Sequence, residues 1–113
     1  MDIHNYERQF KKTLERIENS QEISKVNKKV AVEFKNHLLS DGIGLSKINR
    51  YLFDIMKFNK MLGKDFSKAN KEDIHRVIAD LNQTDLAEET KKGFKILLRK
   101  LYRFIRKIGT TKY

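Results

Sequence analysis

Apolar residues recur at intervals of three and four along most of this chain, a spacing that places them on one side of an α-helix. The pattern predicts helices at about residues 3–18, 22–40, 46–62, 71–81 and 86–108. No stretch alternates between apolar and polar residues over the length of a strand. We therefore expect an all-α fold, a compact bundle of four to five helices.

The same periodicity predicts which side chains form the core. Phe94, Tyr102 and Phe104 are expected in this core rather than as base-stacking groups, because they share helical spacing with leucines. The expected core residues are Ile3, Tyr6, Phe10, Leu14, Ile17, Ile23, Val26, Val30, Phe34, Leu38, Ile48, Leu52, Ile55, Met56, Leu62, Ile74, Val77, Ile78, Leu81, Phe94, Leu97, Leu98, Leu101, Ile105 and Ile108.

Polar and glycine residues predict the helix boundaries. Ser46 is expected to be the N-cap of the third helix, and Asn70 that of the fourth, with Asp73 completing a capping box. Gly42 and Gly63 are expected to end the second and third helices, since glycine readily adopts the left-handed conformation found there.

Positive charge is concentrated in two of the five helices. The chain of 113 residues carries a formal net charge of +10. Residues 46–70 hold six basic and two acidic side chains, and residues 86–113 hold nine basic and two acidic. Residues 1–20 are neutral and residues 71–85 are net negative. Two basic helices in a small domain indicate a polyanionic partner such as nucleic acid.

The composition gives no support for catalysis or metal binding. The chain has no cysteine, and His4, His37 and His75 lack metal-ligand spacing. No phosphate-binding glycine motif occurs, and the loop from Asp41 to Gly44 is interpreted as a turn. We expect no catalytic residue, no metal and no cofactor. Because no apolar run is long enough to span a membrane and no signal peptide is evident, a cytoplasmic location is expected.

Four phrases in order resemble the N-terminal core-binding (SAM-like) domain of tyrosine recombinases, the phage-integrase and Xer-type family, including its archaeal members. They are Phe34-Lys-Asn-His-Leu-Leu39, then Leu45-Ser-Lys-Ile-Asn-Arg-Tyr-Leu-Phe-Asp-Ile-Met-Lys-Phe58, then Ala69-Asn-Lys-Glu-Asp-Ile74, and a last helix containing Thr90 and Ile96-Leu-Leu-Arg-Lys-Leu-Tyr-Arg-Phe-Ile105. Their order and spacing carry the resemblance. The family's catalytic His-x-x-Arg motif does not occur in this chain.

The resemblance implies half of a clamp around duplex DNA, used in DNA recombination and DNA integration. In relatives, two crossed helices approach the major groove near their N-termini, and they correspond to the two basic helices here. It also implies a C-terminal catalytic domain and sister protomers as partners. The residues at the matching positions are Ser46, Lys47, Asn49, Arg50, Thr90, Lys91, Lys92 and Lys95. Among them, Arg50 or Asn49 is expected to reach base edges.

The resemblance further suggests how the chain is organised. Residues 1–20 are expected to form an extra helix packed on the bundle, residues 21–108 the core-binding domain, and residues 109–113 the start of a linker to a missing catalytic domain. The chain is interpreted as an excised domain or natural fragment, and Tyr113 is not expected to be a nucleophile. Two alternatives stay open: a helical protein-interaction module with a basic face, and a nonspecific nucleic-acid-binding domain.

Overall fold

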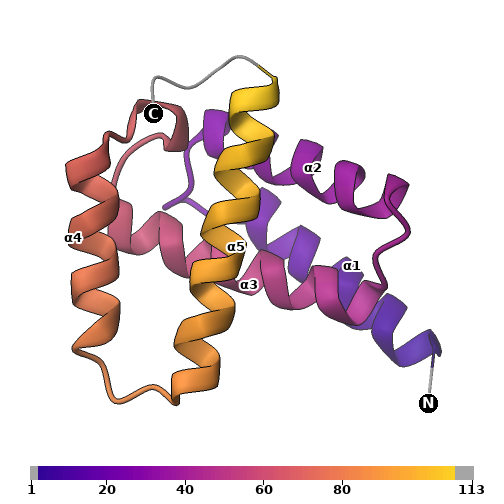
Figure 1. Cartoon of the computed structure of the whole chain (residues 1–113). Coiled ribbons are helices and arrows are strands. Elements are labelled where there is room, and N and C mark those ends of the chain that lie inside the picture. Colours follow the sequence, from indigo (N-terminus) through magenta and orange to yellow (C-terminus); the bar gives the residue numbers. More distant parts are fainter. Residues whose placement is uncertain (1–2, 109–113) are drawn as a thin grey trace. The chain divides into compact units, whose positions relative to one another are not determined.

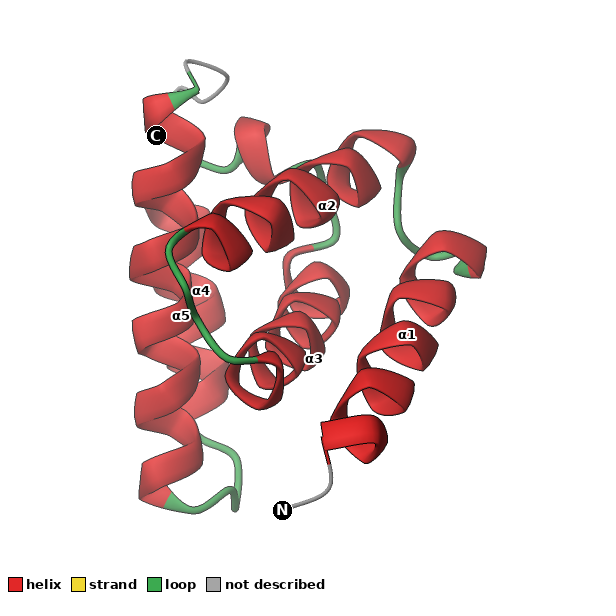
Figure 2. Cartoon of the chain, turned by 90° about the vertical axis from the view of Figure 1, so that its right-hand side faces the viewer, coloured by secondary structure: helices red, strands yellow, loops and turns green. Residues whose placement is uncertain are grey.

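The fold is all-α, as the sequence predicts. The structure is a computed structural model that describes residues 3–108 (Figure 1). Its helices are α1 (Ile3–Asn19), α2 (Lys25–Ser40), α3 (Leu45–Leu62), α4 (Lys71–Asn82) and α5 (Glu88–Lys107), with a 3₁₀ turn, η1 (Phe66–Lys68), after α3. Loops connect them, and no strand occurs in the described part of the chain (Figure 2). No helix in that range is long and apolar enough to span a membrane.

The chain divides into two compact units, and the boundary between them falls within the sequence of α3. One unit is Met1–Lys57 and the other is Phe58–Tyr113. The boundary expected between residues 20 and 21 therefore does not coincide with the division into compact units, and the core-binding domain at 21–108 stays a prediction. The linker expected at residues 109–113 lies outside the described residues.

In the first unit, α2 begins later than the sequence pattern predicts. The side-chain oxygen of Ser20 accepts hydrogen bonds from the backbone N–H groups of Glu22 and Ile23, at 3.2 and 3.3 Å. Ser24 is the N-cap, and its side chain accepts from the backbone N–H of Asn27. These serines stabilise a turn before the helix because short hydroxyl side chains compete for backbone N–H groups. The predicted start at Glu22 is therefore wrong, although Ile23 is buried as expected.

The expected core of α2 is also wrong at one position. Val26 is 47% exposed, whereas the polar Asn27 is 2% exposed. Asn27 lies two turns before Phe34 and so shares its side of α2, whereas Val26 is rotated by about 100° from Asn27 toward solvent. Phe34 and Leu38 are at the centre of the buried side of α2. Val26 lies at the edge of this side and faces solvent. The Nζ of Lys28 donates to the Glu18 carbonyl at 2.7 Å and so connects α2 to the last turn of α1.

In the second unit, aromatic rings join three elements around Phe58, the first α3 residue of that unit. The Phe58 ring stacks on Phe66 of η1 at a centroid distance of 5.3 Å. It also makes edge contacts with Phe94 and Tyr102 of α5, at 6.3 and 6.0 Å. The Tyr102 hydroxyl donates to the Phe66 carbonyl at 2.9 Å. All four residues are at most 2% exposed, so Phe94 and Tyr102 are core residues as predicted. The expectation that Ile108 is buried is wrong, because α5 ends at Lys107 and Ile108 is 37% exposed.

The start of α4 confirms the predicted capping box. The Asn70 side chain accepts from the Asp73 backbone N–H at 2.8 Å, and the Asp73 carboxylate accepts from the Asn70 backbone N–H at 3.0 Å. Lys64 also contacts this carboxylate at 2.9 Å. The hydrogen bond from the Asn70 backbone, aided by Lys64, holds the pKa of Asp73 below its ordinary value.

We expect Tyr102→Phe to lower the free energy of unfolding by about 1 kcal/mol, the usual net value of one hydrogen bond. The loss is modest because the Phe66 carbonyl also accepts from the Ala69 N–H. Tyr6→Phe is the matched control. The side chain of Tyr6 is half-buried, and its hydroxyl has no hydrogen-bond partner within residues 3–108. Urea denaturation measures both, and equal losses would contradict the assigned role of the Tyr102 hydroxyl.

The capping box predicts a specific pH dependence of stability. A carboxylate whose pKa is lower in the folded state stabilises the fold above its unfolded pKa, and this contribution disappears as pH falls through the folded pKa. The stability difference between the wild type and Asp73→Asn should therefore be largest at neutral pH and shrink below the ordinary value of 3.8. Asp80→Asn, an exposed change on the same helix, is the control. A difference for Asp73→Asn that does not vary with pH would contradict this.

Candidate nucleic-acid interface

The first two turns of α3 present two of the predicted contact residues to solvent. Lys47 and Arg50 are both exposed. Ser46 is exposed as well, but it is not the N-cap that the sequence predicts. The helix begins at Leu45, and the Gly44 carbonyl accepts the first helical hydrogen bond, from the Ile48 N–H at 3.1 Å. Ser46 therefore lies inside the first turn, where its hydroxyl is available to a partner on the outer side.

Neighbouring residues restrict the orientation of these two cations. The Lys47 Nζ lies 5.9 Å from the centre of the Tyr51 ring, close enough for a cation–π interaction. Arg50 lies one turn before Asp54, which is buried. Burial raises the pKa of Asp54, while the positive charges of Lys57 and Arg50 oppose that rise. The positive charge of Arg50 therefore interacts with the Asp54 carboxylate of the same helix.

Asn49 is not oriented as base reading requires. Its side-chain oxygen is buried and has no hydrogen-bond partner in the described part of the chain. Reading an adenine takes both the oxygen and the nitrogen of the amide. The expectation that Asn49 reaches a base edge is therefore not supported by this conformation, and Arg50 is the better placed of the two.

Three of the four predicted residues at the start of α5 are at least partly exposed, but Thr90 and Lys92, two residues apart, point to different sides of the helix. Lys92 is exposed, and Thr90 and Lys95 are half-buried. Lys91 differs, because it is only 7% exposed and its Nζ donates to the Asn82 carbonyl at 3.3 Å. Its Nζ also lies 3.5 Å from a Glu88 carboxylate oxygen. The prediction that Lys91 is an exposed contact is wrong.

The sequence does contain the signal that places Lys91 inside. Phe94 follows it by three residues and Leu98 by seven, so Lys91 continues the apolar side of α5 toward its N-terminus. A long aliphatic stem can follow such a surface while its ammonium reaches the end of α4. The last carbonyls of a helix lack partners within the helix, and a cation is stabilised there.

The outer side of α5 carries a continuous line of cations, which we call the α5 cationic stripe. Its members recur every three or four residues, so they share one side of the helix. They are Lys92, Lys95, Arg99, Arg103 and Arg106. No Asp or Glu occurs between Thr90 and Ile108. Lys92, Arg99 and Arg103 are exposed and have no ion pair within residues 3–108, so their charge is open to a partner.

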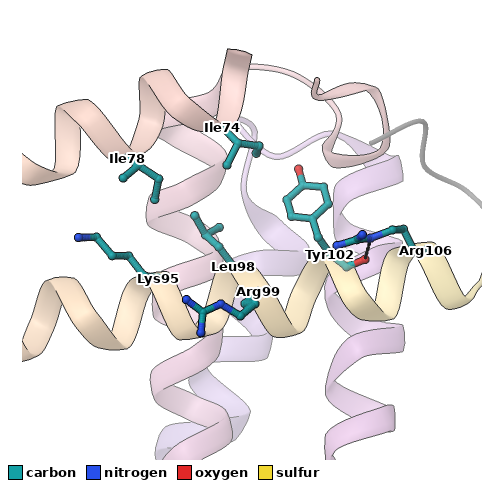
Figure 3. Close-up of a pocket in the computed structure, with 7 residues that line it drawn as sticks. All are labelled: Ile74, Ile78, Lys95, Leu98, Arg99, Tyr102 and Arg106. Carbon is teal, nitrogen blue, oxygen red and sulfur yellow. Dashed lines mark hydrogen bonds between the residues drawn. The ribbon is translucent and has the colours of Figure 1, made fainter. Parts of the chain in front are cut away.

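A cavity of about 290 Å³ lies between α4 and α5, beside this stripe. Figure 3 shows Ile74 and Ile78 extending from α4 toward α5, and Leu98 and Tyr102 extending from α5 toward α4. Three stripe residues, Lys95, Arg99 and Arg106, complete the lining. Sequence periodicity assigns Ile78 and Leu98 to the core but does not reveal that a space is left beside them.

The remaining titratable groups do not form a metal site. No group of three or more His, Cys, Asp or Glu side chains within the described residues could hold a metal ion. His37 lies 3.4 Å from the Asp41 carboxylate, one turn later at the end of α2, and His75 is exposed on α4.

Comparisons with protein-family models, with curated proteins and with solved structures found no match for this chain.

The different environments of adjacent lysines predict different effects on stability. Lys91→Ala should lower the free energy of unfolding by about 1 kcal/mol, because the Asn82 carbonyl loses a charged donor at the end of α4. Lys92→Ala should change it by less than about 0.5 kcal/mol, as exposed substitutions usually do. Thermal and urea denaturation of the two variants check this. Equal stabilities would show that the buried ammonium contributes nothing.

Proposed function

We propose that the chain is a duplex-DNA-binding domain, the core-binding half of a tyrosine recombinase or integrase clamp. The observation that carries the proposal is the α5 cationic stripe, which has five basic residues on one side and no carboxylate after the first turn. Regularly spaced cations on a helix suit the phosphate oxygens of a nucleic-acid backbone, since their contact releases bound counterions. The resemblance in sequence supplies the choice of duplex DNA.

In this proposal, Lys92 and Lys95 of α5 and Lys47 of α3 contact phosphates, with the hydroxyls of Ser46 and Thr90 as additional donors. Arg50 is the residue that reaches a base, where an arginine prefers guanine. Lys91 has no part in binding, because its ammonium is engaged with Asn82.

The proposal assigns no chemical step to this chain. Cleavage and joining of DNA by a tyrosine recombinase require cationic groups around the reacting phosphate, and these belong to the family's other domain. The partners proposed for the whole protein are accordingly duplex DNA, a catalytic domain and sister protomers. Binding by these 113 residues is expected to be in the micromolar range or weaker, since the proposal assigns them only one half of the clamp.

We expect duplex binding to weaken steeply with salt. With about five or six phosphate contacts, log K should fall against log salt with a slope near about −5. Fluorescence anisotropy with a labelled duplex measures this over a salt series. Single-stranded DNA and RNA of the same sequence are the comparison, and equal affinity for all three would favour nonspecific nucleic-acid binding instead.

Three double variants, each removing the same charge, test the location of the interface. Lys92→Ala with Lys95→Ala should weaken binding severalfold and reduce the salt slope by about 2. Lys47→Ala with Arg50→Ala should also weaken binding severalfold but reduce the slope by only about 1, because Arg50 contacts a base rather than a phosphate. Lys11→Ala with Lys12→Ala changes two exposed residues of α1 and should have little effect. Equal losses in all three variants would show that binding follows net charge alone and would contradict the proposed interface.

A further inference from the structure

The cavity between α4 and α5 has a feature that DNA binding does not use, namely an apolar floor. Ile74, Leu98 and Tyr102 are buried core residues, and Ile78 is half-buried at the opening. All four direct their side chains into the space between the two helices (Figure 3). The phosphate contacts proposed for DNA do not use such a floor, since a phosphate group has no apolar surface.

The charged residues that line the same cavity are all cations, and all three come from α5. Lys95 and Arg99 stand on successive turns of α5, and Arg106 follows two turns later. The Arg106 Nε donates to the Tyr102 carbonyl at 3.3 Å, which holds this guanidinium beside the floor (Figure 3). Among residues 3–108, no carboxylate lines the cavity. An anionic group that approaches the opening therefore meets positive charge from α5 without a competing carboxylate in the lining.

The size of the cavity limits what it can hold. Pockets for small-molecule ligands and cofactors are usually about 300–1,000 Å³, and this one is at the lower end. It suits one or two side chains rather than a whole cofactor. An apolar side chain on the floor, with carboxylates of the same segment beside these cations, would satisfy both parts of the lining. Such an anchor within a polar rim is the usual arrangement of a protein–protein hot spot.

We infer that this cavity is a docking site for an acidic amphipathic segment of a partner protein. One leucine or phenylalanine of that segment lies on Ile78 and Leu98, and flanking Asp or Glu side chains pair with Lys95 and Arg99. The inference rests on the cavity alone and does not require that the chain binds DNA. If both hold, the two partners compete for Lys95.

The experiment uses the full chain and three short fluorescent peptides. The first has a single leucine between Asp and Glu residues, the second has serine in place of the leucine, and the third has Asn and Gln in place of the acids. The first should bind, and each of the others should bind about tenfold more weakly, since each removes one half of the complementarity. Equal binding of the first two peptides would overturn the docking site, because attraction would then be electrostatic only.

Matched variants of the protein locate the site. Arg99→Ala should weaken binding of the first peptide about tenfold, whereas Arg103→Ala removes the same charge from the same helix outside the cavity and should weaken it less than about twofold. Equal effects would overturn the assignment. Ile78→Asp places a repelling carboxylate on the floor and should abolish binding, with circular dichroism reporting the fold. If that variant does not fold, Ile78→Ser replaces it, and binding at wild-type affinity would contradict the proposal.

Discussion

Contacts around the ring of Phe58 determine how the second unit is arranged. Phe58 stacks on Phe66 and meets the edges of Phe94 and Tyr102, so one side chain connects the end of α3, the turn η1 and the long helix α5. Edge and offset contacts between aromatic rings contribute beyond the area that they bury. The Tyr102 hydroxyl on the Phe66 carbonyl adds a directional bond to this packing. Together these contacts determine which side of α5 faces inward.

That inward orientation also determines which side chains of α5 reach solvent. Once Phe94, Leu98 and Tyr102 pack inward, residues such as Arg99 and Arg103 must lie on the opposite or flanking side. The first turn contains Glu88 and Glu89 and the last contains Arg106 and Lys107, which matches the polarity of the helix dipole. The positive surface is thus a consequence of core packing together with a sequence that has no carboxylate in the rest of the helix. The proposed DNA binding and the proposed docking of an acidic segment both depend on this separation of apolar and basic side chains on α5.

Periodicity predicts most of this fold and fails where a local hydrogen bond decides the outcome. It identifies the all-α class, the capping box of Asn70 and the burial of Phe94. It fails at the start of α2, because Ser24 is the N-cap and the helix therefore begins later than expected. The preference of serine for the N-cap position also fails at Ser46, because the Gly44 carbonyl accepts the first hydrogen bond of α3. Each failure involves a serine whose position in or before the first turn cannot be chosen from residue preference alone.

The candidate site is predicted in part. Charge counting locates the basic helices, and helical spacing indicates which cations share a side. It does not reveal that the oxygen of Asn49 is buried, or that a cavity remains between Ile78 and Leu98, because both depend on how neighbouring helices fill space. The positive charge of Lys91 led to the prediction that it is exposed. Its position instead continues the buried apolar side of α5.

The bond from Lys91 to the Asn82 carbonyl has a consequence for the segment that it spans. It joins the end of α4 directly to the first turn of α5, so residues 83–87, all exposed, are not alone in keeping the two helices together. The closure entropy of a flexible loop grows slowly, by about 0.6 kcal/mol for each doubling of its length. This connection is therefore a suitable place to insert residues or a reporter peptide without separating α4 from α5. It is also a place where evolution can vary length while the adjoining cationic surface is preserved.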